Sequence, residues 1–132
     1  MSSIFSKIIA GEIPCYRIAE DENYLACLDV NPNAKGHTLC IPKQEINKLF
    51  DLQDQAYLGL MAFAKKVAVA LEKTVPCKRI GMAVIGLEVP HAHVHLIPLN
   101  EMDEMRFQNK VSLSPEEFIA LAQAIQANLQ DK

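Results

Sequence analysis

The sequence lacks several features that would indicate particular classes of protein. It contains 13 basic and 16 acidic residues, a net charge of −3, and no run of lysine or arginine. Binding to nucleic acid or to a membrane surface through bulk positive charge is therefore not expected. The N-terminal residues contain no basic segment followed by a long apolar stretch, so no secretion signal is predicted. The longest apolar-rich segment, residues 58–71, is interrupted by two lysines and is too short for a membrane span.

Paired cysteine motifs and internal repeats are also missing. The four cysteines, at positions 15, 27, 40 and 77, form no C-x-x-C pair. Without a secretion signal we interpret them as reduced thiols of a cytoplasmic protein. No repeat, low-complexity tract or linker divides the 132 residues, of which 50% are hydrophobic. We therefore expect one domain over residues 1–132 that is large enough to bury a core.

Local patterns predict a mixture of helices and short strands. Hydrophobic periodicity and stop signals predict helices over residues 3–11, 54–73 and 114–129. The last helix begins with Ser114 as N-cap, Pro115 at the first helical position and Glu117 as capping-box partner. Strands are predicted over residues 15–20, 23–30, 37–42, 79–89 and 91–99, with a break or kink near Gly86 and Pro90. Because the strands outnumber the helices and cluster together, the predicted class is α+β, a mostly antiparallel sheet with its helices on one side.

Three of the four histidines alternate with hydrophobic residues in the stretch HAHVHLI, residues 91–97. In a strand, His91, His93 and His95 would project from one face, and their apolar neighbours would project from the other. A solvated structural face is one interpretation of this pattern. Such a face has no preference for imidazole over other polar side chains, however, so the alternation favours a functional site.

Two kinds of chemistry fit a row of imidazoles. The first is metal binding, because imidazole is a common metal ligand. Residues two apart in a strand are separated by about 6.7 Å, so a set of two triad histidines with His37 suits one ion better than all three. The second is catalysis at phosphorus, in which one imidazole carries the phosphoryl group covalently while its neighbours donate protons or bind phosphoryl oxygens. A rigid strand suits this positioning, and the spacing favours the second chemistry.

Motifs in both halves of the chain resemble those of a known family. The stretches IFSKIIAGEIP, LDVNP, GHTLCIPK and HAHVHLI are similar to those of histidine triad (HIT) proteins, defined by His-φ-His-φ-His-φ-φ with φ hydrophobic. The resemblance covers most of the chain up to the triad. It implies a HIT-like α+β fold with two main helices and a short N-terminal helix, and a homodimer whose two sheets join. The implied reaction is hydrolysis or transfer at the α-phosphorus of purine nucleoside monophosphate conjugates, with phosphoramidates as first choice and dinucleotide polyphosphates as second.

The resemblance also implies roles for the four histidines. His93 would be the nucleophile that becomes nucleotidylated, and His95 would hydrogen-bond the phosphate oxygens. His37 would assist proton transfer beside the triad. His91 would hold the cluster together through hydrogen bonds.

The nucleotide-binding residues implied by the resemblance lie in three segments. Asp29 would bind the ribose hydroxyls, although it also suits a turn before the NPN stretch. The apolar slot for the base would be formed by Ile4, Phe5, Leu28 and Val30, which equally suit ordinary core packing. Donors near the phosphate would come from the backbone around Gly86, Glu88 and Val89.

The chain departs from the family pattern at two places. Zinc-binding members use an N-terminal C-x-x-C, a later histidine and the first triad histidine. Here Ser3, Ser6 and Glu45 stand at three of those positions, so we expect no metal and no other cofactor.

The second departure removes polar side chains from the expected phosphate site. Leu87 stands where the family usually has Gln, and Leu99 stands where Arg is frequent. Fewer donors would weaken charge stabilisation. A nucleotide- or partner-binding module with little turnover therefore remains an alternative to the enzyme, and a metalloprotein that uses His37 with two triad histidines is a third.

Overall fold

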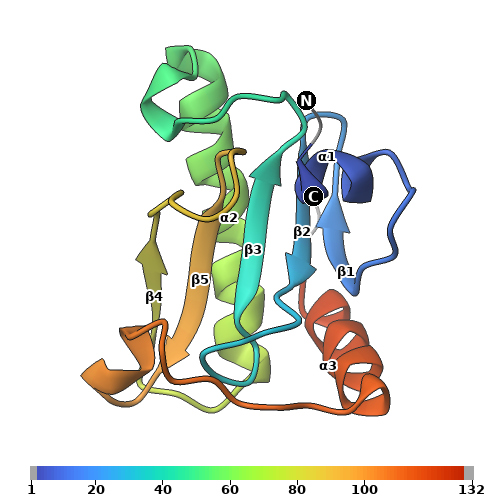
Figure 1. Cartoon of the computed structure of the whole chain (residues 1–132). Coiled ribbons are helices and arrows are strands. Elements are labelled where there is room, and N and C mark those ends of the chain that lie inside the picture. The colour runs from blue at the N-terminus through green and yellow to red at the C-terminus, as the bar shows by residue number, and fades with distance from the viewer. Residues whose placement is uncertain (1–2, 130–132) are drawn as a thin grey trace.

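The computed structural model describes residues 3–129 of the chain (Figure 1). The elements in chain order are α1 (Ile4–Ile9), β1 (Arg17–Glu20), β2 (Tyr24–Leu28), β3 (Thr38–Pro42), the 3₁₀ turn η1 (Leu49–Asp51), α2 (Asp54–Thr74), β4 (Arg79–Ala83), β5 (Val94–Leu99), the 3₁₀ turn η2 (Met102–Met105) and α3 (Pro115–Ala127). The α+β class predicted from the sequence is confirmed. No helix within the described residues has the length and apolar character needed to cross a membrane.

The five strands form one antiparallel sheet in the order β1-β2-β3-β5-β4. The central strand β3 pairs with β2 on one side and with β5 on the other. All five of its residues are buried, because both faces of the sheet are covered at this strand. The strands β1 and β4 form the two edges of the sheet (Figure 1).

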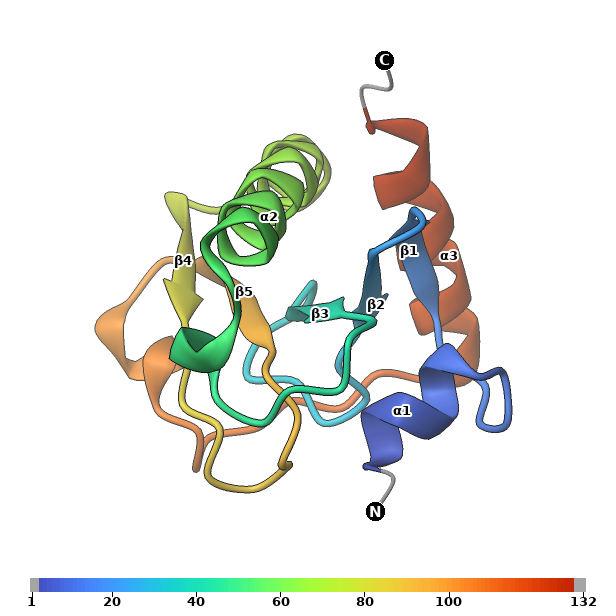
Figure 2. The ribbon, with the colours of Figure 1, turned by 90° about the horizontal axis from the view of Figure 1, so that it is seen from above.

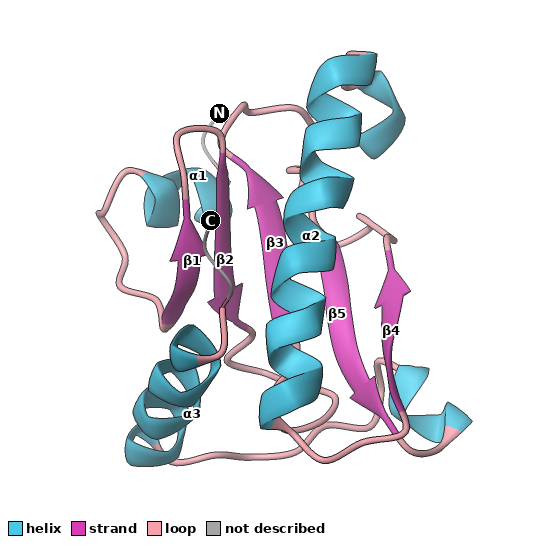
Figure 3. Cartoon of the chain, turned by 180° about the vertical axis from the view of Figure 1, so that it is seen from behind, coloured by secondary structure: helices cyan, strands magenta, loops and turns pink. Residues whose placement is uncertain are grey.

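The two long helices cover one face of the sheet (Figure 3). Helix α2 buries Leu60, Ala64, Val67 and Leu71, which recur every three or four residues and therefore lie on one side of the helix. These side chains pack into the main core with Val94 and Leu96 of β5 and with apolar residues of α3. At the start of α3, Ser114 Oγ accepts from the Glu117 N–H (3.1 Å) and Glu117 Oε1 accepts from the Ser114 N–H (2.7 Å). The predicted capping box is confirmed.

The short helix α1 lies on the opposite face of the sheet from α2 (Figure 2). Its Phe5 packs with Cys27, Leu39 and Ile41 in a second, smaller apolar cluster. Cys27 alternates with the core residues Ala26 and Leu28 along β2, so its side chain points away from α2. The prediction that all helices share one side is therefore wrong for α1.

Three strand predictions are too long. The segment predicted over 23–30 is a strand only from Tyr24 to Leu28. The segment predicted over 79–89 ends as a strand at Ala83, and the one predicted over 91–99 begins only at Val94. Of the three triad histidines, only His95 therefore lies in a strand. The backbone before β5 bonds elsewhere, because the Ala92 N–H donates to the carbonyl of Ile46 (2.7 Å).

Candidate functional site

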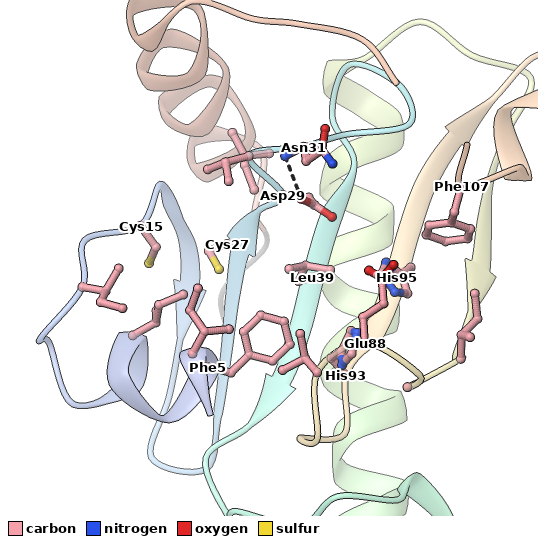
Figure 4. A pocket seen from close by; sticks show the side chains of 18 of the residues that line it. Phe5, Cys15, Cys27, Asp29, Asn31, Leu39, Glu88, His93, His95 and Phe107 are labelled. Atoms are coloured by element: carbon pink, nitrogen blue, oxygen red, sulfur yellow. Dashed lines mark hydrogen bonds between the residues drawn. The ribbon is translucent and has the colours of Figure 1, made fainter. Parts of the chain in front are cut away.

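A cavity of about 420 Å³ opens on the face of the sheet that carries α1 (Figure 4). This volume lies within the usual range for sites that bind small molecules. Ten of the twelve residues proposed from the sequence line it: Ile4, Phe5, Leu28, Asp29, Val30, Gly86, Glu88, Val89, His93 and His95. The other two, His37 and His91, are completely buried and support the lining histidines through hydrogen bonds.

A chain of hydrogen bonds connects the backbone to His95 through His37. The Asn33 N–H donates to Nδ1 of His37 (2.9 Å), so this nitrogen is an acceptor and the neutral ring carries its proton on Nε2. That Nε2 lies 2.9 Å from Nδ1 of His95 and donates to it. His95 in turn carries its proton on Nε2. The chain therefore selects the tautomer of a ring that lines the cavity.

The same reasoning assigns the tautomers of His91 and His93. Nδ1 of His93 lies 2.7 Å from the carbonyl oxygen of His91, which can only accept, so the proton is on Nδ1. The unprotonated nitrogen of this cavity-lining ring is Nε2, whose lone pair is free to attack an electrophile. His91 is fixed by donation from Nε2 to the carbonyl of Pro42 (2.8 Å).

Burial keeps three of the imidazoles neutral near pH 7. Loss of solvent lowers the pKa of His37 to about 3 and that of His95 to about 4, with further lowering by neighbouring histidines and by Lys110. Burial also lowers the pKa of His93, while its hydrogen bond to the His91 carbonyl acts in the opposite direction. Neutral rings retain the tautomers assigned above, so His93 presents a lone pair and His95 presents an N–H donor.

Asp29 has one carboxylate oxygen in a turn and the other near the histidines. Oδ1 accepts from the Asn31 N–H (2.8 Å; Figure 4), whereas Oδ2 lies 3.5 Å from Nε2 of His37. Burial raises the pKa of the Asp29 carboxyl, and the Asn31 amide and the Lys110 charge oppose this rise. The structure thus shows the turn role considered from the sequence, and the same side chain also lines the cavity.

Gly36 fixes the backbone that leads into His37. Its φ of +97° lies in the left-handed region, which favours glycine. A Cβ at this position would lie 3.0 Å from Pro98 Cγ and 3.0 Å from Val75 Cγ2. The glycine in the GHTL motif is therefore explained by both the turn and the close packing beneath His37.

The end of the cavity near α1 is apolar and contains two thiols. The Phe5 ring packs edge-on against His93, with 4.8 Å between centroids. Cys15 and Cys27 also line this end (Figure 4). A hydrogen bond from the Cys27 thiol lowers the pKa of Cys15 to about 7, while the same contact and burial raise the pKa of Cys27. The sequence contained no signal that would bring these two cysteines together.

Two further lining residues were missed because they come from the segment after η2. The Phe107 ring lies edge-on to His95 (4.8 Å between centroids) and to His37 (5.9 Å), and Lys110 lines the cavity beside it. This segment is held by the Val111 N–H, which donates to the carbonyl of Pro32 (2.9 Å). A lone aromatic residue and a lysine in a polar stretch gave no local indication of this position.

The two leucines that depart from the family pattern lie in different places. Leu87 lines the mouth of the cavity and is 89% exposed. Leu99 is not among the residues that line the cavity; it packs over Gly81, where an added Cβ would clash with its side chain. The expectation that Leu99 removes a donor near the phosphate is therefore wrong, whereas the concern about Leu87 stands.

Comparisons with known proteins show the family of the chain. Residues 10–102 match the model of the HIT domain. The chain is 36% identical to an uncharacterized HIT-like protein of Borreliella burgdorferi over 96% of this chain and 97% of the relative. It is 35% identical to the adenosine 5′-monophosphoramidase hnt1 of Schizosaccharomyces pombe over 98% of this chain and 100% of the relative.

Solved structures show the same similarity. A Hit-like protein from Bartonella henselae matches with a TM-score of 0.86 and 31% identity, covering 97% of this chain and 96% of that one. A zinc-bound histidine triad family protein from Mycobacterium smegmatis matches with a TM-score of 0.81 and 29% identity, covering 97% and 93% of the two chains.

Two groups of residues lie where a metal ion could be considered. At the zinc position implied by the family, the hydroxyls of Ser3 and Ser6 lie 3.2 and 3.5 Å from Nδ1 of His91 and contribute no thiolate, so the residues do not fit zinc. Elsewhere in residues 3–129, Asp29, His37 and His95 offer ligand atoms within 4.8 Å of one another. An ion there would have to displace the proton that His37 shares with His95.

Proposed function

The chain belongs to the HIT domain family, and on that premise we propose that it hydrolyses purine nucleoside monophosphate conjugates at the α-phosphorus through a nucleotidyl-His93 intermediate. The conjugates proposed first are phosphoramidates. The observation that carries the proposal is the His93 ring, which lines the cavity, donates from Nδ1 to the His91 carbonyl at 2.7 Å and keeps Nε2 unprotonated. A neutral imidazole with a fixed free lone pair is a competent nucleophile toward phosphorus.

In the first step, Nε2 of His93 bonds to phosphorus while the bond from phosphorus to the leaving nitrogen breaks. The leaving nitrogen takes one proton from solvent and departs as an amine. The positive charge on the phosphorylated ring is stabilised by the Nδ1–H bond to the His91 carbonyl. The oxygen of a water molecule then bonds to phosphorus while the bond from phosphorus to Nε2 breaks and its electron pair returns to His93. One proton of the water goes to solvent, and the nucleoside monophosphate is released.

The other lining groups have complementary roles in this proposal. His95 donates from Nε2 to a phosphoryl oxygen, and His37 holds His95 in the required tautomer. Asp29 accepts hydrogen bonds from the ribose hydroxyls, and the base lies in the apolar end formed by Ile4, Phe5, Leu28 and Val30. The backbone around Gly86, Glu88 and Val89 borders the phosphate. The two yeast relatives named adenosine 5′-monophosphoramidase, at 35% and 40% identity, support the nucleotide hydrolase role and the choice of phosphoramidate.

The decisive experiment measures AMP release from adenosine 5′-phosphoramidate and from a diadenosine polyphosphate by wild type and by His93→Ala. We expect turnover of the phosphoramidate that falls by a factor of about 10³ or more in the variant. Acid-quenched wild-type protein should carry one covalently bound AMP that the variant lacks. Turnover of the dinucleotide alone would move the protein to the second substrate class. AMP binding with no turnover of either substrate would favour the nucleotide-binding module, with Leu87 as its explanation.

We also propose a homodimer that joins two sheets through β4. This strand is an edge of the sheet, and Met82 on it is 46% exposed. Val84 and Ile85, which follow it, are also exposed, and an uncovered apolar edge favours pairing with another chain. Light scattering coupled to size-exclusion chromatography should give about 29 kDa for wild type, twice the chain mass of 14.7 kDa, and the monomer mass for Met82→Lys. A monomeric wild type would contradict the proposal.

A further inference from the structure

The segment between η2 and α3 covers the triad end of the cavity. Phe107 lies edge-on to His95 and is labelled beside it in Figure 4. The segment is held against the loop that follows Asp29, because the Asn33 side-chain amide donates to the carbonyl of Glu104 (3.0 Å) and the Val111 N–H donates to the carbonyl of Pro32 (2.9 Å). These two long-range bonds lie on either side of Phe107 and fix its position over the histidines.

Lys110 is held in the same place by two contacts. Its Nζ donates to Oδ1 of Asn33 (2.9 Å) and lies 5.2 Å from the centroid of the Phe107 ring. The salt bridges found within residues 3–129 do not include Lys110. The ammonium group is therefore fixed in position with no carboxylate at salt-bridge distance among these residues, and its charge acts on the Asp29 carboxyl only from further away. Because Phe107 packs on His95, this charge lies toward the reacting end of the cavity and away from the apolar end formed by α1.

The other described residues that line the cavity supply no second positive charge. Among the described residues that line the cavity, Lys110 is the only lysine or arginine, and the two carboxylates there are Asp29 and Glu88. The lining histidines are neutral for the reasons given above. Leu87, at the mouth of the cavity, provides no polar group. A negatively charged substituent next to the phosphorus would therefore find one cation, the Lys110 ammonium.

We propose that Lys110 is a specificity-determining residue that binds an anionic oxygen of the leaving group, so that the enzyme prefers conjugates whose leaving group is negatively charged. This inference rests on the proposed function and adds the substrate class. A carboxylate on an amine linked through P–N and a phosphate linked through P–O–P both supply such an oxygen. Lysine binds either as a compact point charge.

A matched pair of substrates separates charge from bond type. AMP joined through P–N to alanine has a free carboxylate, and AMP joined to alaninamide has the same P–N bond without the charge. Diadenosine tetraphosphate tests the phosphate source. We expect Lys110→Met to lower kcat/KM by about 10- to 100-fold on an anionic substrate and by less than about threefold on the alaninamide conjugate. Lys110→Arg should restore most of the loss, and Lys35→Met, which removes an exposed lysine outside the cavity lining, should have no effect.

The pattern of losses identifies the source or overturns the inference. A loss confined to the alaninate conjugate assigns the carboxylate, and a loss confined to the dinucleotide assigns the phosphate. Equal losses on the charged and neutral conjugates, or no loss on any substrate, would overturn the role of Lys110.

Failure of the proposed function is recognised separately. Calorimetry on His93→Ala, with and without Lys110→Met, measures binding of the same three ligands in the absence of turnover. If wild type hydrolyses neither these three ligands nor adenosine 5′-phosphoramidate, the proposed function fails. A binding preference for the anionic conjugates that depends on Lys110 would still support the charge recognition, and the lack of such a preference would reject it.

Discussion

The two faces of β3 and β5 are almost equally buried, yet they are buried by different kinds of side chain. Toward α2, Cys40, Val94 and Leu96 pack among apolar residues of the helices. Toward α1, Leu39 and His95 line a cavity with other imidazoles around it. Burial of apolar side chains stabilises the fold, whereas burial of imidazoles opposes their protonation and so reduces stability in acid. One face of the sheet thus maintains the structure, and the other holds groups in forms that favour chemistry over stability.

The neighbouring residues His95 and Leu96 provide the sharpest test of this comparison. On the proposed function, His95→Ala removes the Nε2–H donor to the phosphoryl oxygen, and we expect kcat/KM to fall by about 10²- to 10⁴-fold. Urea unfolding should show a smaller change in stability than that of Leu96→Ala. Full activity of the His95 variant would remove this residue from the chemistry.

Leu96→Ala should have the converse effect. The leucine is 1% exposed in the main core, and its truncation should lower the free energy of unfolding by about 2–5 kcal/mol. The proposed activity, measured well below the unfolding temperature, should stay within about threefold of wild type. A large loss of activity in a folded variant would show that the two faces are coupled through β5.

The elements of the α2 face were largely predictable because their signals are local. The capping box at Ser114 and the spacing of apolar residues in α2 predicted both helices to within about two residues. The ends of the strands near the site could be predicted less well from the sequence. The alternation at His91, His93 and His95 resembles a strand, but the Ala92 N–H bonds to Ile46, 46 positions earlier, and the sheet begins only at Val94.

The residues of the cavity could likewise be predicted where they belong to a short motif, but not where long-range contacts place them. Short motifs identified Asp29, His37 and the histidines that the fold brings together. Phe107 and Lys110 could not be found in this way, because their positions depend on bonds between residues 104–111 and residues 32–33. No periodicity or motif in a single sequence encodes such contacts.

The pH dependence of stability measures the cost of the buried imidazoles. The pKa of His37 is about 3 and that of His95 about 4, both below the ordinary 6.5, so the unfolded chain takes up protons that the native protein does not. Stability should therefore fall as pH falls from about 6.5, with the histidine contribution ending near 4 for His95 and near 3 for His37. Each group contributes up to about 1.4 kcal/mol per pH unit.

Urea unfolding between pH 7.5 and about pH 5 isolates this effect, because most carboxylates titrate at lower pH. His37→Gln should reduce the slope of the free energy of unfolding by about one proton, whatever its effect on absolute stability. Leu96→Ala serves as the control, since it should lower the whole curve without changing the slope. An unchanged slope in His37→Gln would mean that this ring is protonated in the native protein.

The smallest effect is expected at Ser114, where the segment that carries Phe107 and Lys110 enters α3. Ser114→Ala removes the N-cap acceptor for the Glu117 N–H and should lower the free energy of unfolding by about 1 kcal/mol. Because α3 packs on the face opposite the cavity, kcat/KM on a nucleotide conjugate should not change. A decrease in kcat/KM with this small loss of stability would show that the start of α3 helps to hold the segment over the histidines. Ser112→Ala, two residues earlier and outside the cap, is the matched control. A decrease seen in Ser114→Ala but not in Ser112→Ala would locate that coupling in the cap itself.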